Sequence, residues 1–214
     1  MIAVFVHGQK KEDACLSQIT EILNHNKAFV ENKDYETFLS GKFPEKKVVV
    51  LTCMDTRLTE LLPRAMNLRN GDAKILKTAG AVISSPFGSI MRSILVALYE
   101  LQAEEVIVVG HHECGMASLN AEHIMGKMRD RGISDEVLAT LDHAGVNLGQ
   151  WFKGVENETQ GVMHSVNMIV NHPLMPSGVP VHGMLIDPKT GALELIYDGY
   201  EHINANQTGE PTTL

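Results

Sequence analysis

Short runs of apolar residues, rich in β-branched side chains, recur along the chain. The first is Val-Val-Val-Leu at 48–51, and similar runs stand at 73–77, 106–109 and 179–186. A run of this length without regular polar alternation is typical of a strand that is buried on both faces. The pattern therefore predicts four buried strands.

The segment between the second and third runs has a helical pattern. Ser85 suits the N-cap and Pro86 the first helical position, and the apolar residues that follow share one face: Ile90, Ile94, Leu98 and Leu101. A strand, a helix and a second strand in succession indicate a parallel sheet with right-handed crossovers. The predicted fold class is therefore α/β, an open parallel sheet flanked by helices.

The other segments complete one predicted domain, residues 1–214. A helical arm is predicted at about 13–31, and the stretch 116–172 has a mostly helical pattern with interruptions near Gly132 and Gly154.

The last third of the chain contains a turn signal. Asp-Pro-Lys-Thr-Gly at 187–191 separates two apolar runs, so 180–186 and 192–197 are expected to form a hairpin with an antiparallel edge strand. A loose tail is expected at about 203–214.

Composition and charge narrow the classes of function. Apolar residues make up 44% of the chain and charged residues 21%, which are values of a globular protein. The net charge of -8, without any Lys/Arg cluster, predicts no nucleic-acid partner. We recognise neither a signal peptide nor an apolar run of about 18 residues, so a cytoplasmic protein without a membrane partner is expected. Three cysteines argue against a disulfide framework and leave reduced thiols free for metal binding.

Two of the cysteines follow predicted strands. Cys53 stands two residues after the first run, and His111 and Cys114 come directly after the third. Ligands of open parallel sheets gather at the carboxyl ends of strands, so these side chains meet if the first and third strands are neighbours. Two thiolates and one imidazole bind zinc and leave a fourth position for water or a carboxylate, which is the pattern of a catalytic site.

Asp55 and Arg57 stand beside this predicted zinc site. Two residues apart on one loop, they can form an ion pair that keeps the carboxylate ionised and fixes its direction. Released from Arg57, the Asp55 carboxylate can instead take the fourth position at the metal and close the site. Arg57 is therefore expected to decide between an open and a closed state.

The two motifs together resemble the signature of the β-carbonic anhydrase family. They are Cys-x-Asp-x-Arg at 53–57 and His-x-x-Cys-Gly at 111–115, and the resemblance covers about residues 46–118, including Ala79 and Gly80. It implies a sheet in strand order 2-1-3-4 with an antiparallel edge strand. It also implies one zinc ion per chain at the switch between strands 1 and 3, held by the two thiols and the imidazole named above.

The resemblance further implies an activity. Zinc-bound hydroxide attacks carbon dioxide to give bicarbonate, and the catalytic residues Asp55 and Arg57 orient the nucleophile. Ala79, Gly80 and Gly115 are expected to line the substrate pocket. Active sites in this family are lined partly by a neighbouring chain, which implies a homodimer or homotetramer. Because two thiolates supply more negative charge than imidazoles, activity is expected to need mildly alkaline pH.

Three positions depart from patterns found in parts of this family. Val50 and Lys77 stand where members with a non-catalytic bicarbonate site have Trp and Arg, so no cooperative inhibition by bicarbonate is expected. Arg69 stands where plant-type members have Gln, so the resemblance is to the bacterial, non-plant subclass.

Two alternative functions stay open. Related proteins with the same zinc ligands hydrolyse carbon disulfide or carbonyl sulfide, so the ligands indicate a small linear electrophile rather than carbon dioxide alone. A non-catalytic, zinc-stabilised protein for binding or regulation is the other alternative, against which Asp55 and Arg57 argue. We interpret Cys15 as a packing residue of the helical arm and His112 as a neighbour of the site that does not bind the metal.

Overall fold

The computed structural model describes the backbone of residues 9–208 and the side chains of residues 17–204. The chain divides into two compact units, Met1–Ser40 and Gly41–Leu214. The packing role predicted for Cys15 therefore concerns a side chain outside the described residues.

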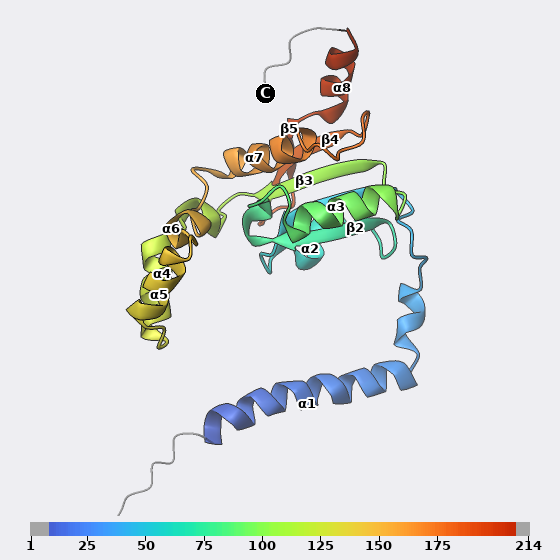
Figure 1. The fold of residues 1–214 in the computed structure, drawn as a ribbon. Coiled ribbons are helices and arrows are strands. Elements are labelled where there is room, and N and C mark those ends of the chain that lie inside the picture. The colour runs from blue at the N-terminus through green and yellow to red at the C-terminus, as the bar shows by residue number, and fades with distance from the viewer. Residues whose placement is uncertain (1–8, 209–214) are drawn as a thin grey trace, which may run out of the picture. The chain divides into compact units, whose positions relative to one another are not determined.

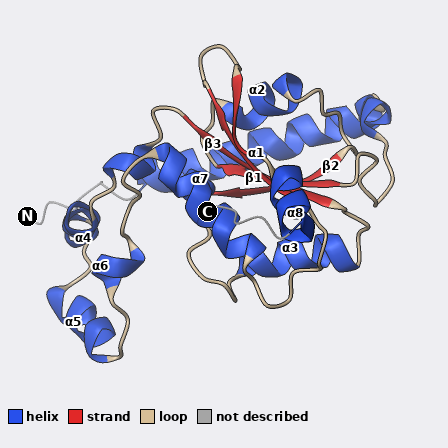
Figure 2. Cartoon of the chain, turned by 90° about the horizontal axis from the view of Figure 1, so that it is seen from above, coloured by secondary structure: helices blue, strands red, loops and turns tan. Residues whose placement is uncertain are grey.

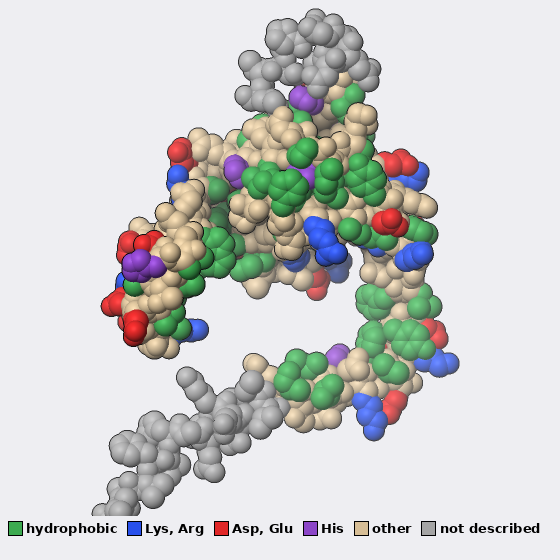
Figure 3. Space-filling view, in the orientation of Figure 1, with side chains coloured by type: hydrophobic (Ala, Val, Ile, Leu, Met, Phe, Trp, Pro, Cys, Tyr) green, Lys and Arg blue, Asp and Glu red, His purple; other side chains and the backbone are tan. Residues whose placement is uncertain are grey.

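Helix α1 forms most of the first unit. It runs over Gln9–Glu31 and is followed by the 3-10 helix η1, Asp34–Phe38. The predicted helical arm is thus confirmed, and it begins earlier than expected. Apolar side chains gather along α1 (Figure 3) and are more than half exposed: Ile19, Ile22, Leu23 and Val30. An apolar stripe of this kind on one helix is typical of a surface that another surface covers.

A five-stranded sheet in the order β2-β1-β3-β4-β5 forms the centre of the second unit (Figures 1 and 2). Its strands are β1 Val48–Cys53, β2 Ala73–Thr78, β3 Glu105–His111, β4 Val181–Ile186 and β5 Leu193–Tyr197. The first four strands run parallel, and β5 pairs antiparallel with β4. The predicted fold class and strand order, with an antiparallel edge, are confirmed.

Helices cover both faces of the sheet. They are α2 Leu58–Ala65, α3 Ser89–Tyr99 and α7 Glu158–Val170. Alternate residues of β1 point to opposite faces, and all of them are buried. Val49 and Leu51 pack with residues of α3 and α7, whereas Val50 packs with residues of α2. Because both faces are covered, the first apolar run needs no polar alternation.

Helix α3 begins later than the sequence predicts. Gly88 is its N-cap, and the Gly88 N–H donates to the Ser85 carbonyl oxygen at 3.1 Å. Ser at the first position of a four-residue turn, Pro at the second and Gly at the fourth are preferences of a type I turn. Ser85 and Pro86 therefore satisfy the chemistry of a turn that precedes the helix, and the predicted Ser85 cap is wrong.

The predicted helical stretch at 116–172 is divided more often than expected. Breaks fall near Gly132 and Gly154 as predicted, and a further break falls near Gly145, where φ is 86°. Glycine reaches such a positive φ without steric cost, which ends the helix there. Besides α7, the segment contains η3 Gly115–Ser118, α4 Ala121–Asp130, α5 Asp135–His143 and α6 Leu148–Trp151.

The predicted hairpin is formed by β4 and β5. Beyond it, helix α8 covers Gly199–Thr208, so residues 203–208 of the expected loose tail are helical. The end of that tail, 209–214, lies outside the described residues. Across the described part of the chain, no helix has both the length and the apolar character needed to cross a membrane.

Candidate metal centre

The three predicted zinc ligands meet at the carboxyl end of the sheet. Cys53 is the last residue of β1 and His111 the last residue of β3, so both strands extend further than the apolar runs indicate. These strands are parallel neighbours, and Cys114 follows on the loop after β3. One ligand atom from each of the three side chains lies within 4.8 Å of the others.

His111 offers a nitrogen lone pair to this group. Its side chain is 1% exposed, and Nδ1 lies 2.8 Å from the His112 carbonyl oxygen, where it acts as the donor. A donating Nδ1 makes Nε2 the unprotonated nitrogen of the neutral ring. Within the described residues, Nε2 is buried without a hydrogen-bond partner. A buried acceptor left in this way is costly, and a metal ion would satisfy it.

The two buried thiols fit a divalent cation. A hydrogen bond from the Cys114 thiol lowers the pKa of Cys53 to about 4 against the effect of burial. Cys53 in turn raises the pKa of Cys114, and burial adds to that rise. One thiolate is therefore stable next to the other thiol, and ionising both needs a strong positive charge beside them. Two thiols and an imidazole are a donor set for zinc.

Backbone contacts hold the donor set in place. The Gly80 N–H donates to the Cys53 Sγ at 3.3 Å. Gly80 has a φ of 71°, and a Cβ there would lie 2.6 Å from the Cγ of Met116, so a side chain would not fit. The Cys114 N–H donates to Oε1 of Glu158 at 3.2 Å, which ties the loop after β3 to α7.

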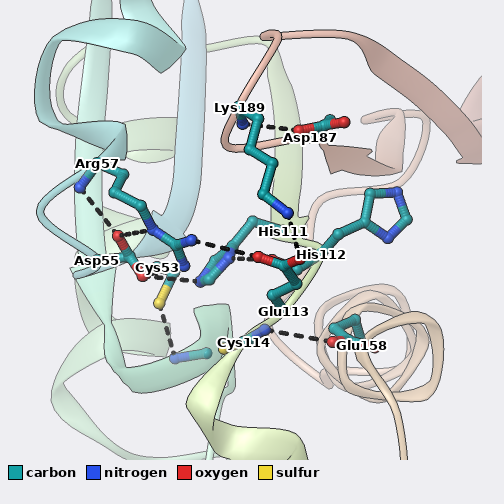
Figure 4. Close-up of polar contacts among 11 residues, drawn as sticks. Cys53, Asp55, Arg57, His111, His112, Glu113, Cys114, Glu158, Asp187 and Lys189 are labelled. Atoms are coloured by element: carbon teal, nitrogen blue, oxygen red, sulfur yellow. Dashed lines mark hydrogen bonds and ion pairs between the residues drawn. The ribbon is translucent and has the colours of Figure 1, made fainter.

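Asp55 and Arg57 form the predicted ion pair (Figure 4). Arg57 donates to Oδ1 of Asp55 from Nε at 3.0 Å and from its backbone nitrogen at 2.9 Å, and to Oδ2 from Nη2 at 2.8 Å. The Arg57 side chain holds the pKa of Asp55 at about 2, so the carboxylate is ionised at neutral pH. Its Oδ2 lies 3.7 Å from Nε2 of His111, which places an oriented carboxylate beside the donor set.

A pocket of about 520 Å³ opens onto the donor set. Ala79, Gly80 and Gly115, which the sequence places in the substrate pocket, all line it. Its wall also contains apolar residues that sequence reasoning missed: Met54, Met116, Leu119, Ile124 and Phe152. The space beside Asp55 is thus bounded largely by apolar side chains.

Two charged residues at the site were also missed. Glu113 Oε2 lies 3.6 Å from Nη1 of Arg57, and Glu113 Oε1 accepts a hydrogen bond from Nζ of Lys189. Glu113 lies within the second motif, but nothing in the motif indicates its partners, and Lys189 is far away in the sequence. The His112 side chain is exposed and lies outside the group of three ligands.

Comparison with known proteins gives concordant results. A sequence profile of the family described as carbonic anhydrase matches residues 48–193. "Putative carbonic anhydrase YvdA" of Bacillus subtilis (strain 168) is 60% identical over 183 residues, 86% of this chain and 93% of that protein. The crystal structure of β-carbonic anhydrase isoform I of Trichomonas vaginalis superposes with a TM-score of 0.78 at 32% identity, covering 86% of this chain and 99% of that one. A "Carbon disulfide hydrolase" of Acidithiobacillus thiooxidans is more distant, 29% identical over 156 residues, 69% of this chain and 76% of that protein.

Proposed function

The chain belongs to the β-carbonic anhydrase family, and we propose that it catalyses the zinc-dependent, reversible hydration of carbon dioxide to bicarbonate and a proton. One observation carries the proposal. A buried donor set of two thiols and an imidazole lies beside a carboxylate that three hydrogen bonds from Arg57 hold in one direction. A zinc site that only stabilises a fold has no need of such a pair.

Cys53, His111 and Cys114 are the residues that would hold the zinc ion. The unpartnered Nε2 of His111 and the paired thiols described above fit that role. When bound, zinc supplies Lewis-acid activation of water, which lowers the pKa of the water and makes a nucleophile available. Two anionic thiolates weaken this effect relative to three imidazoles, so we expect activity to increase from near-neutral to alkaline pH.

The side chains of this protein position the reactants. Asp55 stays ionised because Arg57 lowers its pKa to about 2, so it can accept a hydrogen bond from the attacking water and orient it. Arg57 prevents the carboxylate from turning toward the ligands. The apolar wall of the pocket, which includes Met116 and Phe152, suits a small uncharged molecule such as carbon dioxide.

Hydrolysis of carbon disulfide or carbonyl sulfide is the second candidate. The apolar pocket wall would also accept these molecules, and a more distant relative is described as a carbon disulfide hydrolase. We favour carbon dioxide because the relative that is 60% identical is described as a "Putative carbonic anhydrase", whereas the carbon disulfide hydrolase is 29% identical.

Stopped-flow measurement of carbon dioxide hydration, with zinc content determined on the same sample, tests the proposal. We expect turnover that scales with zinc content, and little release of sulfide from carbon disulfide or carbonyl sulfide. Zinc-loaded protein that releases sulfide but does not hydrate carbon dioxide would favour the second candidate. Zinc-loaded protein inactive on all three substrates would favour a binding or regulatory role.

We also propose that the protein is at least a homodimer, and that a tetramer is the alternative. The apolar stripe on α1, Ile19, Ile22, Leu23 and Val30, is exposed within its own unit and supplies a surface for a second copy. Multi-angle light scattering at micromolar concentration should give at least twice the chain mass of 23.5 kDa. An active monomer under these conditions would contradict the proposal.

A further inference from the structure

Four charged side chains form a continuous row across the candidate metal centre (Figure 4). Asp55 is bound to Arg57, Nη1 of Arg57 lies 3.6 Å from Glu113, and Glu113 is bound to Lys189. The row begins on the loop after β1, crosses the loop after β3 and ends on the turn between β4 and β5. It therefore joins three segments that meet at the same end of the sheet.

Glu113 lies between two cations, and its two contacts are unequal. Its carboxylate accepts a hydrogen bond from Nζ of Lys189 at 2.5 Å, while its 3.6 Å separation from Arg57 Nη1 is an ion pair beyond hydrogen-bond length. Arg57 directs Nε, Nη2 and its backbone N–H to Asp55 instead. In this arrangement Arg57 is the main partner of Asp55, and Lys189 is the main partner of Glu113.

The turn that carries Lys189 is well fixed. Oδ1 of Asp187 accepts hydrogen bonds from the backbone N–H groups of Lys189 and Thr190, at 2.6 and 3.3 Å. The His112 N–H donates to the Ile186 carbonyl oxygen at 3.1 Å, which joins the end of β4 to the loop that carries Glu113. The Lys189 backbone therefore has a defined place relative to Glu113.

We propose that Lys189 is a positioning residue, which holds Glu113 and so keeps the Arg57 guanidinium on Asp55. Without the Lys189 charge, Glu113 has Arg57 as its nearest cation, and the guanidinium is divided between two carboxylates. The hydrogen bonds that orient Asp55 then weaken. This inference rests on the proposed function only where activity is concerned, because the contact between Arg57 and Asp55 can be measured separately.

The expected effect is moderate because the side chains of Glu113 and Lys189 are 56% and 67% exposed. Ion pairs of this exposure are screened by water and salt. We therefore expect Lys189→Met to lower kcat by about twofold to fivefold, with a smaller change in KM. The effect should diminish at high salt.

Hydrogen exchange at the Arg57 Nε–H, followed by ¹⁵N NMR on the full-length protein, measures the contact directly. Its signal is assigned by its absence in Arg57→Lys. Lys189→Met should speed this exchange about threefold or more, in line with the lost ion pair. Lys189→Arg, which keeps the charge, should restore both the exchange rate and kcat.

The double variant isolates the path through Glu113. In a Glu113→Gln background, adding Lys189→Met should change neither the exchange rate nor kcat, because no competing carboxylate is left. Lys47→Met is the matched control. Lys47 makes the same 2.5 Å contact with Glu104, with 51% and 67% exposure, at the opposite end of β1 and β3, and its loss should leave both measurements unchanged.

The possible outcomes distinguish the role of Lys189 from the proposed hydration of carbon dioxide. Unchanged Arg57 exchange in Lys189→Met, or an equal acceleration in the Glu113→Gln background, would overturn the role of Lys189. The expected exchange pattern in a zinc-loaded protein that does not hydrate carbon dioxide would support that role and overturn the proposed function instead.

Discussion

Replacing Arg57 by alanine is expected to lower carbon dioxide hydration by about a hundredfold, while zinc content stays near one ion per chain. The Arg57 side chain supplies two of the three hydrogen bonds to the Asp55 carboxylate, and alanine would keep only the one from the backbone N–H; displacing an orienting group by about 1 Å can cost this much in rate. The freed carboxylate lies close to Nε2 of His111, so it can take the remaining position at the metal. The variant should therefore keep its metal and lose turnover.

Two further variants make this experiment decisive. Arg64→Ala removes an exposed arginine that contacts Glu60 within α2, and it should retain full activity. Asp55→Ala combined with Arg57→Ala should not restore full activity, because the orienting carboxylate is then missing as well. An Arg57→Ala enzyme as fast as wild type would contradict the assigned role of the pair.

The low pKa of Asp55 means that this residue does not cause the expected increase of activity with pH. Its pKa of about 2 lies below the ordinary value of 3.8, so its ionised pairing is complete above that ordinary value and is lost only as the pH falls toward 2. Asp55 therefore does not titrate between neutral and alkaline pH. The increase of wild-type activity over that range should follow ionisation of the attacking water, and a pH–rate profile with zinc occupancy measured throughout would show it.

Replacing Cys114 by alanine is expected to weaken zinc binding by more than about 100-fold. Loss of a residue that only supports a metal ligand already lowers metal affinity by about 10- to 100-fold. The same holds for Cys53→Ala and His111→Ala, because the three ligand atoms lie within 4.8 Å of one another. Elemental analysis after dialysis against a mild chelator measures the result. Cys15→Ala is the matched control, because it removes a cysteine outside the predicted ligand set, and this variant should bind zinc as the wild type does. Full zinc occupancy in Cys114→Ala would show that the ligand assignment is wrong.

The strands and the ligand set were predictable because each has a local signal. The run at 48–51 lacks polar residues because β1 is covered on both faces, and the pattern shows this directly. Cys53 and His111 follow apolar runs, so their meeting required only that β1 and β3 be neighbours. The family resemblance supplied that strand order.

Other features depend on contacts between distant segments and had no such signal. Glu113 is an ordinary exposed residue until the turn between β4 and β5 brings Lys189 to it. Phe152 follows α6 and lines the pocket only because the chain folds back to the metal centre there, which the sequence does not show. The predicted Ser85 cap was wrong because Pro86 suits both a helix start and a turn, and Gly88 favours the turn.

Cys53 and His111 end two paired strands and Cys114 follows on the loop after β3, which determines when the proposed metal site is complete during synthesis of the chain. Cys53 leaves the ribosome well before His111, and the complete donor set exists only after β3 has been made and has joined β1. A nascent chain that ends before Cys114 has no complete site to offer. If the chain binds zinc as proposed, the complete donor set is available to the metal only once β1 and β3 have paired, in contrast to small zinc domains, in which the metal drives folding.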